Sequence, residues 1–430
     1  MKVGVAGLWH LGTVTAACLA SAGHEVTAFD GSRGTIEELR GGRVPVAAPG
    51  LQELIVRVTS SGALRFSWNP ADLADSEVVW LTYDTPVDED GIADVAFVLQ
   101  AAAELFPHLR DDSLLLISSQ LPVGSTRLLE ETFRRTRPDG GTAFAYSPEN
   151  LRLGKAIEVF TRPDRVVVGI RNEGDKERIR RLLGPFTERI EWMAVESAEM
   201  TKHALNAFLA TSVVFANELA ALCERVGASG QEVERGLKSD VRIGPRAYLR
   251  PGAAYAGGTL ARDVAFLIEL GRARAVATPM VAAVRESNDV HKGWARRRLQ
   301  EILGDVRGTT VAILGLTYKP GTDTLRGSGA VDTARWLRSS GASVAAYDPA
   351  VRTLPSGLAD ILELRDSLEG ALDKADAALV ATEWPEFRSL APADLVRRMR
   401  SPVLLDPSRF LGPEFGDDAR IRYVYVGKPA

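Results

Sequence analysis

The chain begins with a strand pattern, a turn that contains two glycines and a helix pattern, and this order constrains the fold more than any other feature. Lys2–Ala6 is an apolar run, residues 7–12 form the turn, residues 11–21 are typical of a helix, and Glu25–Phe29 is a second apolar run. Such an order predicts a βαβ unit with two parallel strands. Further strand-like runs, separated by helical stretches, lie at 78–81, 114–118 and 166–169. This alternation predicts a doubly wound sheet with helices on both faces.

The same layout recurs in the last third of the chain. Thr310–Leu314 is an apolar run, a glycine then opens a loop, residues 331–339 are typical of a helix, and Ser343–Tyr347 is a second strand pattern. Val403–Leu405 is a late strand pattern. The recurrence concerns the order of elements and not a short sequence repeat, so it predicts a second Rossmann-like domain.

The middle of the chain has a different character. Residues 196–226 contain neither proline nor glycine and are rich in Ala, Leu and Glu, which predicts one long helix. Residues 245–259 are rich in glycine and proline and predict a loop. We therefore predict an α/β protein with two Rossmann-like doubly wound domains, 1–195 and 301–430, joined by a helical middle domain, 196–300, that contains one long helix.

Composition excludes several classes of function. The 430 residues carry a formal net charge of −4 and no basic run, so nucleic-acid binding and polybasic docking to a membrane lack their usual electrostatic basis. The only two cysteines, Cys18 and Cys223, rule out a disulfide framework and a cysteine-rich zinc module. We expect no metal, no membrane span and no targeting segment, and we expect a reducing, cytoplasmic location.

The first glycine turn predicts a dinucleotide site, because it follows a strand and resembles the fingerprint G-x-G-x-x-G. Gly7 and Gly12 match the first and third glycines, and Trp9 stands where the second glycine normally lets the backbone approach the pyrophosphate. Asp30 ends the second strand, where an acidic residue accepts hydrogen bonds from the adenosine ribose and disfavours a 2′-phosphate. The turn therefore predicts NAD as the cofactor. The alternative is a doubly wound domain that has lost its nucleotide.

Short motifs follow one another over the whole chain. They occupy residues 45, 49–54, 84–88, 119–125, 147–154, 199–202, 206–210, 217–218, 315–320, 323, 325–326, 347–349 and 382–384. In their order and spacing they resemble the motifs of the UDP-glucose/GDP-mannose dehydrogenase family. For example, residues 119–125 resemble S-T-V-P-V-G-T, and residues 147–154 resemble S-P-E-F-L-R-E-G. The resemblance implies an enzyme that oxidises the C6 alcohol of a nucleotide sugar in two NAD-dependent hydride transfers, and a homodimer formed through the middle domain.

In that family a cysteine in the motif G-G-x-C-L-P-K-D traps the aldehyde that the first transfer produces. The resulting thiohemiacetal gives up the second hydride, and water hydrolyses the thioester. When Tyr248 and Pro251 upstream and residues 262–263 downstream are held as anchors, Thr259 takes the place of the cysteine. Because a threonine hydroxyl is far less acidic than a thiol, we predict an atypical member that lacks the catalytic cysteine.

Neither real cysteine is placed to substitute for the missing thiol. Cys18 lies in the helix after the glycine turn and Cys223 lies near the end of the long helix, so both are interpreted as small core residues. Two other family positions differ as well. Gln120 replaces a threonine that helps to hold the catalytic water in the family, and Leu153 replaces a glutamate near the cofactor and the substrate.

Other catalytic residues of the family are retained. Lys202 and Asn206 are one helical turn apart and share a face, and the resemblance implies that they bind the C6 oxygen and stabilise its developing charge. It also implies that Asp263 positions a water or acts as a base and that Glu149 is an acid or base. Together with Thr259, these are the candidate catalytic residues.

The resemblance further implies two sets of binding residues. The cofactor contacts are Gly7, Trp9, His10, Leu11, Gly12, Asp30, Thr85, Gln120, Arg262 and Arg326. The substrate contacts are Glu149, Leu151, Lys202, Asn206, Tyr248, Pro251, Gly257 and Lys319. The identity of the nucleotide base and of the sugar stays open.

The loss of the thiol leaves several outcomes open. The reaction stops at the aldehyde, or water adds directly to the aldehyde and the second oxidation follows, or the oxidation takes place at another ring carbon and gives a keto-sugar. A non-enzymatic alternative is a sugar-nucleotide-binding homologue with altered chemistry. The retention of Lys202, Asn206 and Asp263 favours the enzyme.

Overall fold

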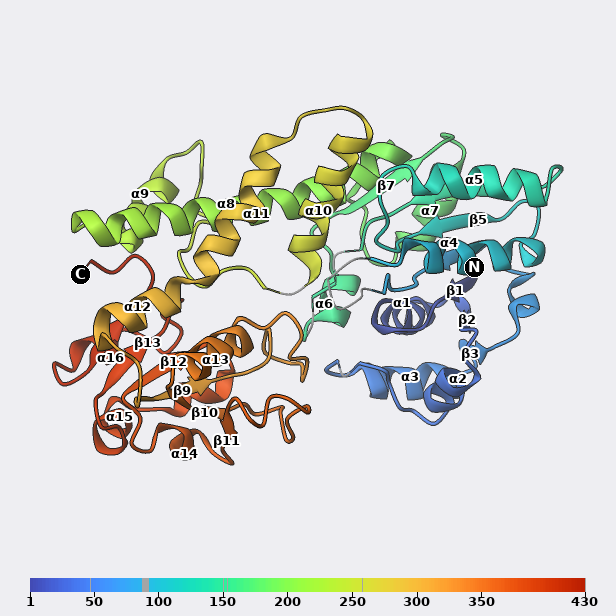
Figure 1. The fold of residues 1–430 in the computed structure, drawn as a ribbon. Helices are drawn as coiled ribbons and strands as arrows, with labels where there is room; N and C mark the ends of the chain where they lie inside the picture. The colour runs from blue at the N-terminus through green and yellow to red at the C-terminus, as the bar shows by residue number, and fades with distance from the viewer. Residues whose placement is uncertain (47, 87–92, 150, 153, 257, 430) are drawn as a thin grey trace. The chain divides into compact units, whose positions relative to one another are not determined.

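The computed structural model describes residues 1–430 except 47, 87–92, 150, 153, 257 and 430. The chain forms two compact units, Met1–Ala204 and Leu205–Ala430, and the boundary between them falls inside the long helix. Figure 1 draws the two units and labels their helices and strands. Each unit contains one twisted sheet that is covered by helices on both faces.

The first unit is built on an eight-stranded sheet in the order β3-β2-β1-β4-β5-β6-β7-β8. Its strands are β1 (Lys2–Ala6), β2 (Glu25–Phe29), β3 (Leu64–Ser67), β4 (Val78–Leu81), β5 (Leu114–Ile117), β6 (Ala143–Tyr146), β7 (Val166–Ile170) and β8 (Ile190–Ala194). All neighbouring pairs are parallel except β6 and β7, which run antiparallel, so this one pair departs from the parallel sheet that alternating strands and helices predict. The chain order reverses between β1 and β4, which is where open α/β sheets bind their ligands.

Two groups of helices cover this sheet. Its helices are α1 (His10–Ser21), α2 (Arg33–Arg40), α3 (Leu51–Ser60), α4 (Val95–Leu105), α5 (Ser125–Thr136), α6 (Ala156–Thr161) and α7 (Asp175–Leu183), with short 3₁₀ helices at Pro70–Leu73 and Phe106–His108. Apolar side chains of α1, α2, α3, α6 and α7 pack on one face, and those of α4 and α5 pack on the other. Both faces of the sheet are therefore shielded from water by helices, as the alternation of strands and helices in the sequence predicts.

The long helix α8 (Val195–Val226) confirms the prediction made from residues 196–226. It has 32 residues. It is followed by α9 (Gly230–Ser239), α10 (Gly258–Ala273), α11 (Pro279–Lys292) and α12 (Trp294–Leu303). Because α10 begins at Gly258, Thr259 lies in the first turn of a helix, and the predicted loop over 245–259 extends too far at its end.

The second unit contains a six-stranded, wholly parallel sheet in the order β11-β10-β9-β12-β13-β14. Its remaining elements are β9 (Thr310–Leu314), α13 (Gly329–Ser339), β10 (Ser343–Tyr347), β11 (Glu363–Leu364), α14 (Leu368–Leu372), β12 (Ala377–Val380), a 3₁₀ helix at Pro385–Ser389, α15 (Pro392–Arg398), β13 (Val403–Leu405), α16 (Glu414–Asp417) and β14 (Arg422–Val424). The chain order reverses between β9 and β12. This unit thus repeats the topology of β3-β2-β1-β4 in the first sheet, and the predicted fold class is confirmed.

Candidate active site

The turn between β1 and α1 has the geometry of a dinucleotide site. Gly7 has a φ of +94°, and a Cβ atom at Gly12 would lie 1.8 Å from the carbonyl oxygen of Gly7. Only glycine is compatible with both positions, because helix and turn approach each other so closely. Asp30 holds the turn from the end of β2, since its carboxylate accepts hydrogen bonds from the backbone N–H groups of Leu8 (2.9 Å) and Ser32 (2.9 Å).

The residues between the two glycines leave the turn open. Trp9 is the N-cap of α1 and its side chain caps no backbone N–H, so no capping side chain blocks a phosphate at the start of the helix. The indole of Trp9 is 50% exposed and is therefore not packed inside the turn. His10 begins α1, and Leu11 lies in its first turn. The paired glycines, the open helix end and Asp30 fit a dinucleotide such as NAD.

Two predicted cofactor residues meet at the ends of β4 and β5. Thr85 and Gln120 are both buried, and the hydroxyl of Thr85 donates a hydrogen bond of 2.7 Å to the carbonyl oxygen of Gln120. The structure therefore brings these residues of two separate motifs together at the carboxyl edge of the first sheet. Arg262 lies in the first turn of α10, and Arg326 lies in an exposed segment before α13. The roles of all four residues in cofactor binding stay predictions.

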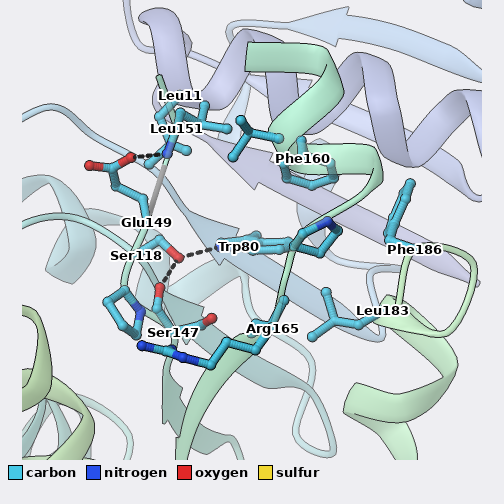
Figure 2. A pocket seen from close by; sticks show the side chains of 14 residues that line it. Leu11, Trp80, Ser118, Ser147, Glu149, Leu151, Phe160, Arg165, Leu183 and Phe186 are labelled. Carbon is cyan, nitrogen blue, oxygen red and sulfur yellow. Dashed lines mark hydrogen bonds between the residues drawn. The ribbon is translucent and has the colours of Figure 1, made fainter. Parts of the chain in front are cut away.

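A small apolar cavity lies beside this edge of the first sheet (Figure 2). It measures about 80 Å³, and Leu11, Trp80, Phe160 and Phe186 form much of its wall. Its polar end is organised by Trp80, whose indole N–H donates to the hydroxyl of Ser118 (2.8 Å), while that hydroxyl donates to the carbonyl oxygen of Ser147. The chain from Ser147 then leads directly to Glu149.

Glu149 and Lys202 form the first pair of predicted catalytic residues that the structure joins. Lys202 is only 7% exposed, and its Nζ donates to the carbonyl oxygen of Glu149 at 2.5 Å and lies 3.4 Å from its Oε1. The other carboxylate oxygen of Glu149 accepts from the backbone N–H of Leu151 (2.9 Å). A buried ammonium beside a carboxylate is able to stabilise an oxyanion and to exchange a proton. Leu153, a substituted family position, lies outside the described residues.

Asn206 and Asp263 form the second pair. The side-chain amide of Asn206 on α8 donates to the carboxylate of Asp263 on α10, and Asp263 is completely buried. Thr259 lies one turn before Asp263 on the same helix, so both side chains belong to one face of α10. The two helices thus join Asn206 to Asp263, and α10 places Thr259, which is exposed, one turn away from this pair. One turn of α8 separates Lys202 from Asn206.

Sequence reasoning missed how α8 is held against the first sheet. Glu199 is completely buried and accepts hydrogen bonds from the backbone N–H groups of Gly124 (2.6 Å) and Thr126 (2.9 Å), so it caps α5 from another helix. His203 donates to the carbonyl oxygen of Leu121 at 2.9 Å. Glu199, Lys202 and His203 are three or four residues apart and therefore share one face of the helix. Polar residues at this spacing in an otherwise apolar helix are the sequence signal that could have predicted this contact face.

A larger cavity lies at the carboxyl edge of the second sheet, where its strand order reverses. It measures about 380 Å³, and its lining includes Lys319, Ser328–Ala330, Thr382 and His291. The start of α13 therefore opens into a cavity that also carries a lysine, and both features favour a phosphate group. Of the other predicted substrate residues, Pro251 is buried, Tyr248 is 61% exposed, and Gly257 lies outside the described residues.

Comparison with known protein families matches nearly the whole chain. Residues 1–187 match the NAD-binding domain of the UDP-glucose/GDP-mannose dehydrogenase family, residues 196–290 match its central domain, and residues 312–413 match its UDP-binding domain. The chain belongs to this family. It is therefore an NAD-dependent nucleotide-sugar dehydrogenase. Residues of the matched UDP-binding domain, among them Lys319 and Thr382, line part of its larger cavity.

Individual relatives agree with this assignment. The chain is 34% identical over 438 residues to UDP-glucose 6-dehydrogenase of Rhizobium meliloti, and the match covers 100% of both proteins. It is 35% identical over 444 residues to the enzyme of the same name from Pseudomonas aeruginosa, of which 98% is covered. The structure of a UDP-glucose dehydrogenase from Pyrobaculum islandicum matches with a TM-score of 0.88 at 30% identity, and covers 100% of this chain and 98% of that one.

Two further observations concern metals and membranes. In the part of the chain that the structure describes, no group of three or more His, Cys, Asp or Glu side chains is arranged to hold a metal ion. By length and composition α8 could cross a membrane, with a mean hydropathy of 1.5 over its most apolar window, although we expected no such segment from the sequence. Because α8 belongs to the matched central domain and carries Lys202 and Asn206, we interpret it as a core helix.

Proposed function

We propose that this enzyme oxidises the C6 alcohol of a UDP-glucose-like nucleotide sugar and does so without a cysteine thioester. The proposal depends on Thr259, which the motif anchors on either side align with the family's cysteine and which lies one turn from Asp263 on α10. The Lys202–Glu149 and Asn206–Asp263 contacts support retained chemistry, since a degraded site would not be expected to keep both. The names of the relatives support UDP-glucose as the first substrate to test.

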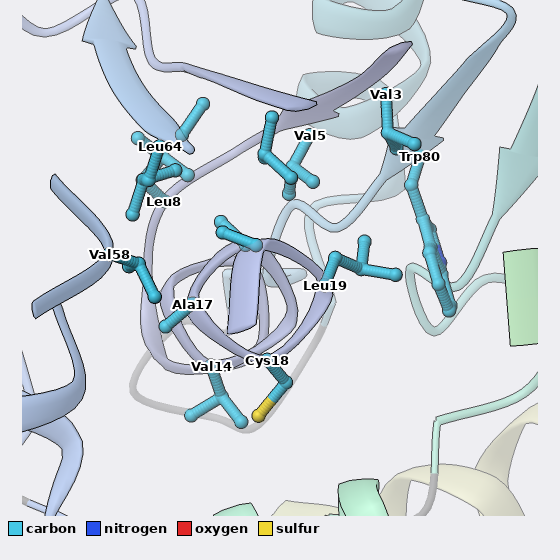
Figure 3. Packing of buried hydrophobic residues seen from close by; sticks show 14 of the residues in the cluster. Val3, Val5, Leu8, Val14, Ala17, Cys18, Leu19, Val58, Leu64 and Trp80 are labelled. Atoms are coloured by element: carbon cyan, nitrogen blue, oxygen red, sulfur yellow. The ribbon is translucent and has the colours of Figure 1, made fainter. Parts of the chain in front are cut away.

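The positions of the two cysteines support the absence of a catalytic thiol. Cys18 is fully buried in the apolar cluster around α1, together with Val14 and Leu19 (Figure 3). Burial raises the pKa of the Cys18 thiol to about 12, so it stays protonated and is a poor nucleophile. Cys223 is also buried, near the end of α8. Both behave as small apolar core residues.

In this proposal the retained side chains supply the groups that the first oxidation needs. When NAD is bound, its nicotinamide ring supplies the hydride acceptor. The C6 hydroxyl loses its proton to a carboxylate, for which Glu149 and Asp263 are the candidates, while Lys202 and Asn206 donate hydrogen bonds to the oxygen as charge develops on it. The C6 hydrogen leaves with its electron pair, and the product is the aldehyde.

A second oxidation needs no covalent enzyme intermediate in this proposal. Water adds to the aldehyde carbon while a carboxylate takes one of its protons. The C6 hydrogen of the resulting hydrate would then pass with its electron pair to a second NAD, bound after the first NADH has left. The product is the carboxylic acid. If the site adds water too slowly, the aldehyde is released instead.

We also propose a homodimer, a cytoplasmic location and the three domain limits 1–195, 196–300 and 301–430. A stripe on α8 supports the dimer, because Phe208, Phe215 and Leu222 are spaced seven residues apart and are 70%, 47% and 61% exposed. Large apolar side chains in such a row are typical of a helix that packs against another chain.

The test combines product analysis with a variant that restores the thiol. UDP-glucose and other nucleotide sugars are incubated with NAD, and NADH is counted per sugar; two equivalents indicate the acid, and one indicates an aldehyde or a ketone. We expect Thr259→Cys to increase the yield of acid or to accumulate a thioester that mass spectrometry detects, while the control Thr259→Ser keeps the wild-type product. An unchanged product of Thr259→Cys, together with an introduced thiol that no aldehyde substrate labels, would contradict the placement of Thr259.

A further inference from the structure

One wall of the larger cavity is a loop whose backbone lacks the hydrogen bonds of a helix or a strand. Residues 250–256 form neither helix nor strand, and Ala253–Ala256 line the cavity. Pro251 and Gly252 are nevertheless buried, so the backbone polar groups around them need partners. Those partners are side chains from two helices and from the segment after β13.

Two buried asparagines bind the backbone of this loop. Asn217 on α8 accepts from the N–H of Gly252 (2.9 Å) and donates to the carbonyl oxygen of Ala253 (3.4 Å). Asn288 on α11 accepts from the N–H of Tyr255 (3.0 Å) and donates to its carbonyl oxygen (3.1 Å). Both asparagines are almost completely buried, at 1% and 2% exposure, so each replaces water for a stretch of irregular backbone.

His291 makes the third contact and is also part of the cavity wall. Its Nε2 donates to the carbonyl oxygen of Gly252 at 2.9 Å, and the same residue lines the cavity. Burial lowers the pKa of His291, so the ring is neutral and its single proton is committed to this bond. Asn288 and His291 are three residues apart and therefore share one face of α11.

The opposite side of the loop is held by Ser408, which follows β13. The guanidinium of Arg250 donates to the carbonyl oxygen of Ser408, and the N–H of Ala253 donates to its hydroxyl at 3.4 Å. The loop is thus fixed between α8, α11 and the end of a strand of the second sheet. A change in any of these contacts alters the shape of the cavity wall without touching a ligand.

We propose that Asn217, Asn288 and His291 are positioning residues that hold residues 250–256 in the shape that admits the nucleotide sugar. The proposal rests on the proposed function only in that the nucleotide occupies this cavity. Among the three residues His291 is the most important in this proposal, because its ring both lines the cavity and binds the loop backbone.

The experiment compares His291→Phe with His291→Gln in the full-length enzyme. The loss of one buried hydrogen bond is expected to raise KM for the nucleotide sugar and Kd for UDP about tenfold, with kcat changed less than about threefold. The glutamine side chain still has an N–H that reaches toward Gly252, so His291→Gln is expected to recover most of the binding. A purely structural role predicts instead that both variants lose thermal stability with KM unchanged.

A matched control separates positioning from general destabilisation. His24 makes the same type of buried bond, from Nε2 to the carbonyl oxygen of Leu182 (3.1 Å), but it lies before β2 at the amino edge of the first sheet. His24→Phe is expected to lower the melting temperature without changing Kd for UDP. Equal UDP binding by wild type and His291→Phe would overturn the inference.

A second variant keeps the inference testable if His291→Phe does not fold. Asn288→Asp retains the acceptor for the N–H of Tyr255 but replaces the donor to its carbonyl oxygen by a charged acceptor, so weaker UDP binding is expected.

Calorimetric titration of the wild-type protein with UDP separates the positioning role from the proposed reaction. A wild-type protein that binds UDP but oxidises no nucleotide sugar contradicts the proposed reaction and leaves the positioning role intact. A wild-type protein that does not bind UDP contradicts both.

Discussion

The glycine turns after β1 and β9 begin in the same way and end differently. In the first, Gly7 has a φ of +94° and its N–H donates to the carbonyl oxygen of Phe29 (3.0 Å); in the second, Gly315 has a φ of +91° and donates to Tyr347 (2.7 Å). Each turn is then held by an aspartate from the neighbouring strand. Leu8 N–H donates to Asp30 at 2.9 Å, just as Leu316 N–H donates to Asp348 at 2.7 Å. The two domains share one local solution to the strand–turn junction.

The environments of the two aspartates differ. Asp30 is partly exposed, and α1 begins at His10, directly after the turn. Asp348 is 1% exposed and receives further hydrogen bonds from Thr317, from the N–H of Ala350 (2.9 Å) and from the indole of Trp384 (3.1 Å). A long loop that carries Lys319 follows the second turn, and α13 begins only at Gly329.

This difference explains how one topology serves two ligands. Where the aspartate has unused lone pairs at the surface, it is free to accept hydrogen bonds from ribose hydroxyls, as in the NAD-binding domain. Where Trp384 and backbone N–H groups use those lone pairs, the aspartate is part of the core, and we expect the loop and the start of α13 to contact the ligand instead. We therefore expect specificity for NAD and for the nucleotide sugar to depend on the residues that surround the shared turn geometry.

The strongest test of this comparison is the removal of each aspartate. Asp348→Ala leaves several buried donors without an acceptor and is expected to cost at least about 3 kcal/mol of folding free energy. Asp30→Ala removes fewer bonds at a partly exposed site and is expected to cost about 1 kcal/mol. Scanning calorimetry of both variants measures the difference. Equal melting temperatures would show that the acid of the second domain is not the buried anchor that its contacts indicate.

A smaller effect is expected on the choice of cofactor. Asp30→Asn retains an acceptor for the N–H of Leu8 but removes the negative charge that disfavours a 2′-phosphate. We expect kcat/KM with NAD to fall about tenfold and the ratio of NAD to NADP activity to fall further, because a charged hydrogen bond is worth roughly 1.5–3 kcal/mol. Steady-state kinetics with both cofactors gives the ratio, and the variant Asp348→Asn in the other domain is the control. An unchanged ratio for Asp30→Asn would indicate that another group discriminates against the phosphate.

The contrast between the turns also shows which structural features can be predicted from the sequence. The βαβ openings and Asp30 were predictable, since they depend on residues that follow one another along the chain. The burial of Asp348 was not predictable, because it depends on a hydrogen bond from Trp384, which follows β12 and is distant in sequence. For the same reason the capping of α5 by Glu199 was missed. Strand β12 was also missed, because its alanine-rich sequence does not separate a buried strand from a helix.

The predicted catalytic residues show the same contrast between local and tertiary information. The prediction that Lys202 and Asn206 share a face follows from helical periodicity alone and is independent of tertiary structure. Their partners, the carbonyl and carboxylate of Glu149 and the carboxylate of Asp263, belong to other elements and became visible only when those elements were placed. Thr259 was predicted in a loop because the helix start at Gly258 is not signalled by a capping residue in the glycine-rich sequence.

The smallest expected effect concerns Trp9, which has no counterpart in the fingerprint. Trp9 has extended backbone angles, with φ −78° and ψ −152°, so glycine is not required there for conformational reasons. Trp9→Gly removes the side chain at the point where the pyrophosphate approaches the start of α1, and we expect NAD to bind roughly two- to fivefold more tightly, less than about 1 kcal/mol. Calorimetric titration with NAD measures the change, and Trp9→Ala separates the effect of the indole from that of the Cβ atom. If both variants bind NAD more weakly, the half-exposed indole covers part of the dinucleotide, and the first turn is then adapted to its ligand at a position where the fingerprint has only a glycine.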